Sequence, residues 1–215
     1  MHMTAITYFY TDEGKKLIVV SDRQVTHESE LREKEKVLKK GRFFIFCAGS
    51  EDIYLKVLGD VNSNRTSIKR LARFMRNKVM KIMEERGKIG MDVSPCEFVI
   101  IDSINLNAFV IIRGTDSPAL DFGIVGSGEK YVREVNNIFS RLVPTGFQLR
   151  SIRFSDTVYS RILEAYDTLA YKDPYIGHPA LFGLNIYVFQ KRRHKNYKLR
   201  FNHDVRDFNS YGGLI

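Results

Sequence analysis

Short apolar runs, rich in β-branched and aromatic residues, alternate with charged segments along the chain, and most of these runs have the length of a β-strand. Residues 4–10 and 17–21 are two such runs, and the TDEGKK segment between them predicts a hairpin with Gly14 at the turn. The run RFFIFCAG predicts a further strand that ends at Gly49. The charged segment 28–41 separates this strand from the first hairpin.

The second half of the chain continues the strand pattern. CEFVIIDS and NAFVIIRG, separated by INL, predict another apolar hairpin. A short strand is expected near LDFGIVG, and LFGLNIYVFQK with NYKLRFNH predicts a last hairpin. The strands therefore fall into three groups, which two longer segments separate.

Those two longer segments have apolar residues at helical spacing, and each predicted helix starts at a serine or threonine that favours an N-cap. The four predicted helices run from Ser50 to about Leu58, from Thr66 or Ser67 to about Arg86 before Gly87, from Ser127 to about Val143, and from Ser155 to about Tyr171.

The resulting order is strands, two helices, strands, two helices, strands, which is not the alternation of a doubly wound sheet. Two antiparallel sheets packed face to face, each covered by one helix pair, would bury the apolar stripe of every helix. We therefore expect an α+β fold, a four-layer αββα sandwich. Because no linker composition interrupts the 215 residues, the whole chain, 1–215, is expected to form one domain.

The formal net charge of +9 and the sequence pI of about 9.5 raise the question of nucleic-acid binding. Much of the excess lies on the predicted helix that follows Ser67, and a second basic cluster, residues 191–195, is expected at a hairpin turn. No zinc-ligand spacing, recognition-helix motif or interleaved aromatic residues accompany these charges. A solvated basic surface is the favoured interpretation, and nucleic acid is not expected as the main partner.

The two cysteines, Cys47 and Cys96, lie within apolar strand-like runs without a CxxC partner or metal-ligand neighbours, so both are expected to be packed thiols. No apolar run reaches the roughly 18 to 20 residues that cross a bilayer, and the first residues lack the layout of a secretory signal. We expect a cytoplasmic protein without a membrane partner, a metal or a cofactor.

Thr4 begins the first apolar run and is the first candidate for chemistry. Read alone, it is an ordinary strand residue. As the first residue of a mature chain, however, it would carry a hydroxyl and a free α-amine, whose ordinary pKa of about 8 lets it accept the hydroxyl proton at neutral pH. One residue would then supply both the nucleophile and the base.

Charged residues are predicted to lie near Thr4. The second strand runs into VSDRQVT, and the hairpin places Asp22 close to the start of the first strand. The segment EKEKVLKK supplies Lys36, with Lys34 as a rival on the same face if the segment is extended. A buried ammonium beside the threonine would lower the pKa of its hydroxyl and stabilise an oxyanion.

The motifs TAITYF, LIVVSDRQVT, KVL, FFIFCAGSED and IVGSGEKYV, in this order, resemble the proteasome β-subunit family and its bacterial relatives, which are N-terminal-nucleophile (Ntn) hydrolases. In that family a mature N-terminal threonine strand is followed by an A-D-x-R-x-T turn, a lysine before an apolar pair, an A-G strand end and a G-S-G before a helix. The resemblance spans nearly the whole chain and implies the Ntn-hydrolase sandwich and a threonine-type peptidase activity.

Position by position, the resemblance implies that Thr4 is the nucleophile and base and that Asp22 and Lys36 are the charged pair that activates it. The backbone N–H of Gly49 would donate to the oxyanion. A peptide carbonyl bound there would be attacked by the Thr4 oxygen, and the resulting acyl-enzyme would be resolved by water or by another amine.

The resemblance further implies that Ser127 joins a proton network around the α-amine, with Asp173 in YKDPYIGHP as its partner, and that the backbone of Thr26 lines the substrate groove. The sequence also departs from the family pattern. Gln24 stands where arginine is common, and the family's second serine cannot be placed in the loop beyond Asp173.

The residues before Thr4 decide whether this chemistry is available. His2 is too large for the usual removal of Met1, whereas a chain begun at Met3 would be trimmed to Thr4. Alternatively, the Thr4 hydroxyl could attack the preceding carbonyl and release residues 1–3, which would then be a propeptide. Met1 and His2 also fit a cloning remnant.

The sequence therefore predicts a proteasome-like threonine hydrolase that cleaves or transfers peptide bonds in peptides or unfolded proteins. A ring or other homo-oligomer is expected to shield the site, and an ATP-driven unfoldase is a candidate partner. The alternative is a non-catalytic homologue, a scaffold or binding subunit in which residues 1–3 permanently cap Thr4.

Overall fold

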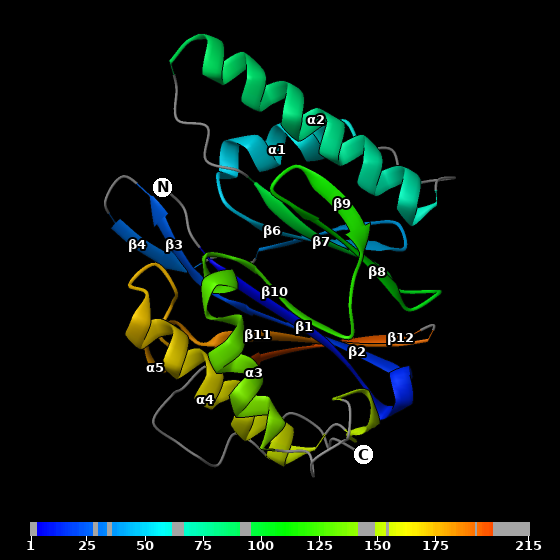
Figure 1. Cartoon of the computed structure of the whole chain (residues 1–215), viewed down its shortest axis with the longest axis vertical. Coiled ribbons are helices and arrows are strands. Elements are labelled where there is room, and N and C mark those ends of the chain that lie inside the picture. Colours follow the sequence, from blue (N-terminus) through cyan, green and yellow to red (C-terminus); the bar gives the residue numbers. More distant parts are fainter. Residues whose placement is uncertain are drawn as a thin grey trace.

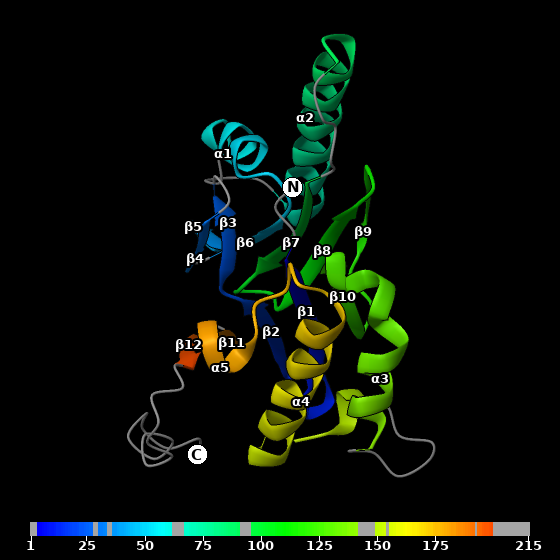
Figure 2. The same cartoon turned by 90° about the vertical axis from the view of Figure 1, so that its left-hand side faces the viewer.

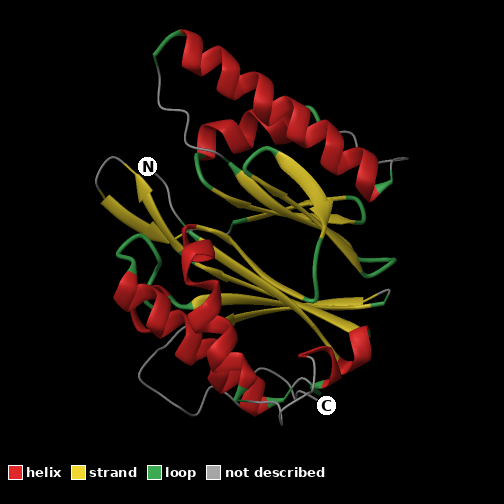
Figure 3. Cartoon of the chain, in the orientation of Figure 1, coloured by secondary structure: helices red, strands yellow, loops and turns green. Residues whose placement is uncertain are grey.

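A computed structural model of the chain confirms the predicted α+β sandwich (Figure 1). Two antiparallel sheets of five strands lie in the middle, and helices cover both outer faces, as Figure 3 shows. The structure describes residues 4–27, 30–33, 36–61, 67–90, 96–141, 149–153, 155–191 and 193–199.

The first sheet carries the start of the chain in its interior. Strand β1 (Ala5–Thr11) pairs with β2 (Lys16–Asp22) on one side and with β10 (Phe122–Gly126) on the other. Strand β11 (Leu184–Gln190) follows β2, and β12 (Arg193–Leu199) forms the edge. The order β10-β1-β2-β11-β12 therefore joins segments from both ends of the chain.

The second sheet has the order β5-β6-β7-β8-β9, which follows the sequence. Its strands are β5 (Val37–Lys40), β6 (Phe43–Ala48), β7 (Glu97–Asp102), β8 (Asn107–Ile112) and β9 (Thr115–Pro118). A separate two-stranded ribbon, β3 (Gln24–His27) with β4 (Glu30–Glu33), connects β2 to this sheet along the chain.

Helices α1 and α2 lie over the second sheet, and α3 and α4 lie over the first (Figures 1 and 2). The helices are α1 (Glu51–Gly59), α2 (Ile68–Lys88), α3 (Val132–Ser140), α4 (Asp156–Lys172) and α5 (Pro179–Phe182), with short 3-10 turns η1 (Asp12–Gly14), η2 (Ser127–Tyr131) and η3 (Leu149–Ser151).

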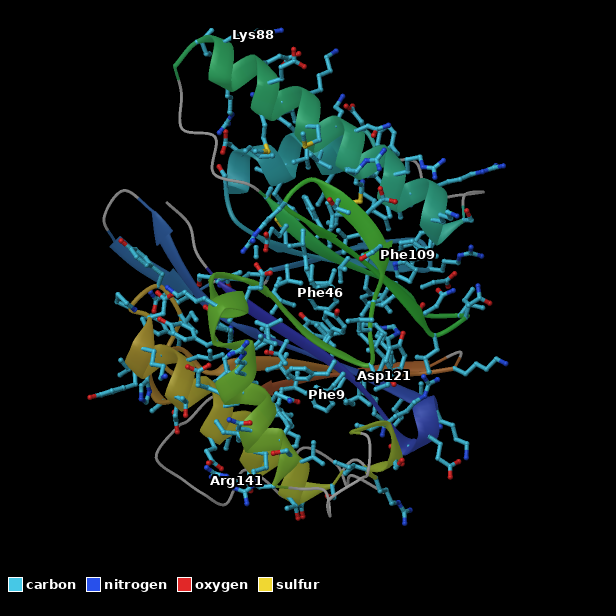
Figure 4. All side chains as sticks on the ribbon, viewed as in Figure 1. Phe9, Phe46, Lys88, Phe109, Asp121 and Arg141 are labelled. Atoms are coloured by element: carbon cyan, nitrogen blue, oxygen red, sulfur yellow. The ribbon has the colours of Figure 1, made fainter. Side chains whose placement is uncertain are left out.

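Alternation along the strands divides the core into layers. On β1, Ala5 and Phe9 pack toward α3 and α4, whereas Ile6 and Tyr8 pack toward the second sheet. Figure 4 shows Phe9 on the helix side of the first sheet and Phe46 between the sheets. Because β1 and β2 are covered on both faces, their apolar runs are nearly continuous, and this is why they read as buried strands in the sequence.

Two helix boundaries differ from the prediction. Helix α2 does not stop before Gly87 but continues to Lys88, because Gly90, with φ of +70°, supplies the left-handed residue beyond its end. The helix expected to start at Ser127 begins as the turn η2, and its α-helical part starts at Val132.

The structure confirms the predicted cap of α2 but not those of α1 and α4. Ser67 caps α2, since its side chain accepts a hydrogen bond from the backbone N–H of Arg70 (3.3 Å). Ser155 and Ser50 hold the N-cap positions of α4 and α1, but neither side chain makes a capping bond. Ser50 instead donates to the Asp52 carboxylate.

Several strands lie in charged segments in which the sequence pattern predicted no strand. The segment 28–41 contains β4 and β5, and residues 193–195 of the basic cluster belong to β12 rather than to a turn. Strands β5 and β12 are both edge strands, and charged side chains are common there because they oppose pairing with another chain. The prediction of a turn over the whole cluster was wrong for this reason.

Candidate active site

Thr4 immediately precedes β1 and contacts Ser127, the first residue of the turn η2. Its backbone oxygen accepts hydrogen bonds from the Ser127 N–H (2.9 Å) and the Ser127 hydroxyl (3.3 Å). The next residue, Ala5, pairs with Gly126 of β10. Thr4 is 3% exposed, so its hydroxyl must find partners inside the protein.

Asp22, the last residue of β2, provides the first of these partners. Its side chain is fully buried, and its Oδ1 accepts from the Thr4 hydroxyl and from the Ala5 N–H (3.0 Å). Its Oδ2 accepts from the Lys36 ammonium (2.9 Å) and from the Gly177 N–H (3.1 Å). Four donors thus occupy the roughly four lone-pair positions of one carboxylate, which compensates for its removal from water.

Lys36, immediately before β5, provides the second partner. Its ammonium donates to the Thr4 hydroxyl oxygen as well as to Asp22, and its backbone oxygen accepts from the Cys47 N–H (3.1 Å) of β6. Burial lowers the pKa of the Lys36 ammonium, and the Asp22 carboxylate opposes this shift. Of the two rival lysines, Lys36 is in contact with Thr4, whereas Lys34 lies outside the described residues.

Gly49 directly follows β6 and has a φ of +119°, a backbone conformation that favours glycine. Gly49 therefore marks the end of β6, which pairs with β5, the strand that Lys36 precedes. Thr26 lies in the ribbon strand β3, paired with Leu31, and its side chain lies outside the described part of the structure. Ser127 contacts Thr4 through the Thr4 backbone oxygen.

Asp173 follows α4 and is 2% exposed. The described contacts of its side chain are an ion pair with Lys130 of η2 (3.0 Å) and a hydrogen bond from the Tyr175 N–H (3.0 Å). It therefore holds the turn that contains Ser127 through Lys130, and no described contact joins it to Thr4 or Ser127 themselves.

The loop after α4 contributes residues that the sequence reasoning missed. The Gly177 N–H donates to Asp22, and Gln24 donates through its side-chain amide to the Pro174 oxygen (3.0 Å). Gln24 thus links β3 to this loop from the position at which arginine is common in the family that the sequence resembles. The described loop 173–178 contains no serine, and the buried Ile176 lies between the Asp173 and Gly177 contacts.

The two cysteines are buried, which fits their expected role as packed thiols. Their sulfur atoms lie 3.0 Å apart on the helix-facing side of the second sheet. Within the described ranges, no group of three or more His, Cys, Asp or Glu side chains is arranged to hold a metal ion. In the same part of the chain, none of the helices combines the length and apolar character needed to span a membrane.

The basic face of α2 is partly neutralised by acidic side chains of its surroundings. Arg76 pairs with Asp116 (2.5 Å) and Lys88 pairs with Glu84 (2.7 Å). Lys78 and Arg86 pair with acidic residues of the segment 52–60. The Lys88–Glu84 pair is exposed on both sides, and pairs of this kind contribute little to stability, typically about 0 to 1 kcal/mol each.

Comparison with solved structures identifies the fold. The chain is similar to Anbu (ancestral beta-subunit) from Yersinia bercovieri, with a TM-score of 0.67 and 14% sequence identity over 93% of this chain and 88% of that chain. No protein-family model matches the sequence, and no curated protein matches it. The likeness therefore lies in the fold alone, which is the proteasome-like sandwich.

Chemically, the site combines the buried hydroxyl of Thr4, the Asp22 carboxylate that accepts a hydrogen bond from it, and the Lys36 ammonium that donates a hydrogen bond to its oxygen. Such a cation favours the deprotonated form of the hydroxyl, and the carboxylate keeps the cation in place. All three side chains come from the ends of strands or from the residue before one, so the scaffold that positions them is rigid.

Proposed function

We propose that this chain is a proteasome-like N-terminal threonine hydrolase that cleaves, or transfers, peptide bonds through an acyl-enzyme on Thr4. The observation that carries the proposal is the contact of the Thr4 hydroxyl with both Asp22 and Lys36 in a buried position. The proteasome-like fold supports it.

In the proposed reaction, residues 1–3 are first removed and the Thr4 α-amine becomes free. The Thr4 oxygen attacks the peptide carbonyl while its proton passes to that amine, which gives a tetrahedral intermediate. The oxyanion is stabilised by the Gly49 N–H and the Lys36 charge. The proton then passes to the leaving amine, the C–N bond breaks, and water or a second amine resolves the ester.

The proposed substrates are peptides or unfolded proteins, in an assembly of several copies that shields the site. An ATP-driven unfoldase is the proposed partner for folded substrates. Both follow from the same resemblance as the catalytic roles, and both depend on a free Thr4.

The alternative function is a non-catalytic subunit in which residues 1–3 stay attached and Thr4, 3% exposed, stays buried. If these residues stay attached, Thr4 has no free amine and the proposed base is absent. The two functions therefore differ in the state of the chain terminus.

The test uses a peptide epoxyketone, whose two electrophilic carbons require a hydroxyl and an adjacent free amine. Three chains are compared by intact mass before and after reaction: the chain begun at Met1, the chain begun at Met3, and the latter with Thr4→Ala. We expect the chain begun at Met3 to lose its methionine and gain one probe mass and the Thr4→Ala chain to gain none.

Labelling of the chain begun at Met1, after loss of residues 1–3, would indicate self-processing. Labelling that persists in Thr4→Ala would refute Thr4 as the nucleophile. If neither threonine-containing chain reacts although its mass shows a free Thr4, the hydrolase proposal fails. A chain begun at Met1 that keeps residues 1–3 and gains no probe mass supports the scaffold.

A further inference from the structure

Glu97 is a buried acidic residue that none of the roles above uses. It is the first residue of β7, it pairs with Ala48 of β6, and it is 6% exposed. Val99 and Ile101 of the same strand face the first sheet, and Glu97 shares their side by alternation. Its carboxyl group therefore lies between the two sheets, at the end where Ala48 leads into Gly49.

The Glu97 side chain makes a hydrogen bond across the gap between the sheets. Its Oε2 accepts from the backbone N–H of Gly126 (2.8 Å), the last residue of β10. The next residue is Ser127, whose N–H and hydroxyl hold the Thr4 backbone oxygen. The hydrogen bond from Glu97 of the second sheet thus fixes Gly126, the residue before the turn η2, and Ser127 of this turn binds the Thr4 backbone oxygen.

The sheets touch closely at this point. A Cβ added at Gly126 would lie 2.2 Å from the Thr4 backbone oxygen and 2.8 Å from the Ala48 Cβ, so Gly126 is wedged between β1 and β6. Gly126 also has a φ of +90°, which other residues rarely adopt. Its position consequently sets how Thr4 of the first sheet lies relative to the end of β6 in the second.

A second link between the sheets reaches the same turn but is of a weaker kind. The Arg113 guanidinium, beyond β8, pairs with Glu129 of η2 at 3.0 Å, and the Arg113 side chain is 75% exposed. Water and salt screen such a pair. The Glu97 bond is shielded from both, and a buried hydrogen bond to a carboxyl group is costly to leave unmade.

We propose that Glu97 is a positioning residue, which ties the Ser127 turn to the second sheet and thereby aligns Thr4 with Lys36 and Gly49. This role rests on the proposed hydrolase function, which it deepens. Glu97 touches no reacting atom in it, because it acts through Gly126 and Ser127. The chemistry required of position 97 is a hydrogen-bond acceptor of the right length, and a charge is not required.

The test compares Glu97→Gln, which keeps an acceptor oxygen, with Glu97→Leu, which removes it. Hydrogen exchange of the peptide spanning residues 124–131 measures how firmly the turn is held, and peptide turnover by the chain begun at Met3 measures kcat and KM. We expect Glu97→Leu to speed exchange in that peptide and to lower kcat by about 10- to 100-fold with little change in KM, the effect of a small misalignment. Glu97→Gln should stay within about 3-fold of the unsubstituted chain.

Asp102 provides the matched control, because it is a buried acid at the other end of β7 that accepts from the Ile104 N–H (3.1 Å) and the Asn105 side chain (2.8 Å). Asp102→Leu and the milder Asp102→Asn should leave exchange in 124–131 and kcat unchanged.

The proposal is overturned if Glu97→Leu leaves exchange in 124–131 unchanged, or if the Asp102 variants reproduce its loss of kcat. Should Glu97→Leu fail to fold, Glu97→Gln against Glu97→Ala gives the same comparison. Exchange does not depend on turnover, so a chain without any activity refutes the hydrolase while the exchange data still decide the role of Glu97.

Discussion

The backbone N–H of Gly177 donates a hydrogen bond to Asp22 Oδ2 at 3.1 Å, although the two residues are 155 positions apart in the chain. The loop after α4 therefore completes the set of donors around the carboxylate that faces Thr4 and Lys36. Gly177 is also in contact with Gln24, since a Cβ at position 177 would lie 2.7 Å from the Gln24 Cβ.

Replacement of Gly177 by alanine should push this loop away from Asp22 and Gln24. We expect a loss of about 1 to 3 kcal/mol in the free energy of unfolding, as for other overpacked sites, together with slower epoxyketone labelling. Urea unfolding and labelling rates measure the two effects. Gly59→Ala, at the end of α1 where a new Cβ meets nothing within 4 Å, is the control and should leave both unchanged.

Asp22→Asn should remove most of the reactivity of Thr4. The amide nitrogen of asparagine is a donor, so it would face two of the four donors that now meet the carboxylate, and the Lys36 charge would be left without its partner. We expect labelling to slow by about 100-fold or more and the unfolding free energy to drop by about 3 to 5 kcal/mol. Asp116→Asn breaks a partly exposed pair with Arg76 instead, and a similar loss of labelling there would argue against a specific role for Asp22.

The rate of labelling should fall at alkaline pH because Lys36 loses its proton. Burial lowers the pKa of this ammonium, with Asp22 and Cys47 opposing the shift, so deprotonation occurs at lower pH than in an exposed lysine. The arginine of Lys36→Arg stays charged throughout that pH range. Labelling of this variant should be slower, but its rate should not fall at alkaline pH. The measurement is the pH profile of the labelling rate, and an identical decline in Lys36→Arg would assign the titration to another group.

Stability should fall with rising pH over a window that Glu97 defines. Burial and the nearby Glu129 raise the pKa of Glu97, while the Gly126 N–H and Arg113 oppose this. Between the unfolded value of about 4.3 and the raised folded value, the folded chain binds more protons than the unfolded chain, so its stability decreases as pH increases. Urea unfolding at several pH values should show a smaller decrease for Glu97→Gln, and an equal decrease in both chains would contradict the assignment.

Tyr166→Phe should weaken the attachment of α4 to the first sheet without disabling Thr4. The buried Tyr166 hydroxyl donates toward the Val20 oxygen (2.8 Å) and accepts from the Thr7 N–H (3.2 Å). Because phenylalanine leaves these backbone groups without this partner, we expect a loss of about 1 to 3 kcal/mol in unfolding free energy. Labelling per folded molecule should be unchanged, and a selective loss of labelling would instead link Tyr166 to the site.

Much of the fold could be predicted because the buried strands β1, β2, β6, β7 and β11 are apolar on both faces. The edge strands β5 and β9 and the first residues of β12 could not, because charges such as those of residues 193–195 resemble a loop when the partner strand is unknown. Gly87 was expected to end α2 because a glycine near the end of a helix is usually its stop, whereas the left-handed residue is Gly90.

The contacts around Thr4 divide in the same way. Asp22 lies near Thr4 through a hairpin, which is a local relationship that the sequence pattern predicts. Gly177 and Glu97 reach the site through tertiary contacts alone, and neither the glycine in YIGHP nor the glutamate that opens EFVIID carries a local signal of that role. Asp173 was expected beside Ser127 by resemblance, and its described ion pair is with Lys130, one turn further along η2.

The close contact of the two sheets at Gly126 also bears on when the site can exist during synthesis. Thr4 and Asp22 belong to the first sheet, whereas Lys36 and Gly49 flank strands of the second, and Ser127 lies beyond the midpoint of the chain. A nascent chain that ends before Ser127 therefore holds a threonine without its backbone anchor, and a first sheet that has not docked on the second holds a threonine without its cation. Under the proposed function, a partly folded chain would not cleave other proteins, and Thr4 would become reactive only once the two sheets have docked.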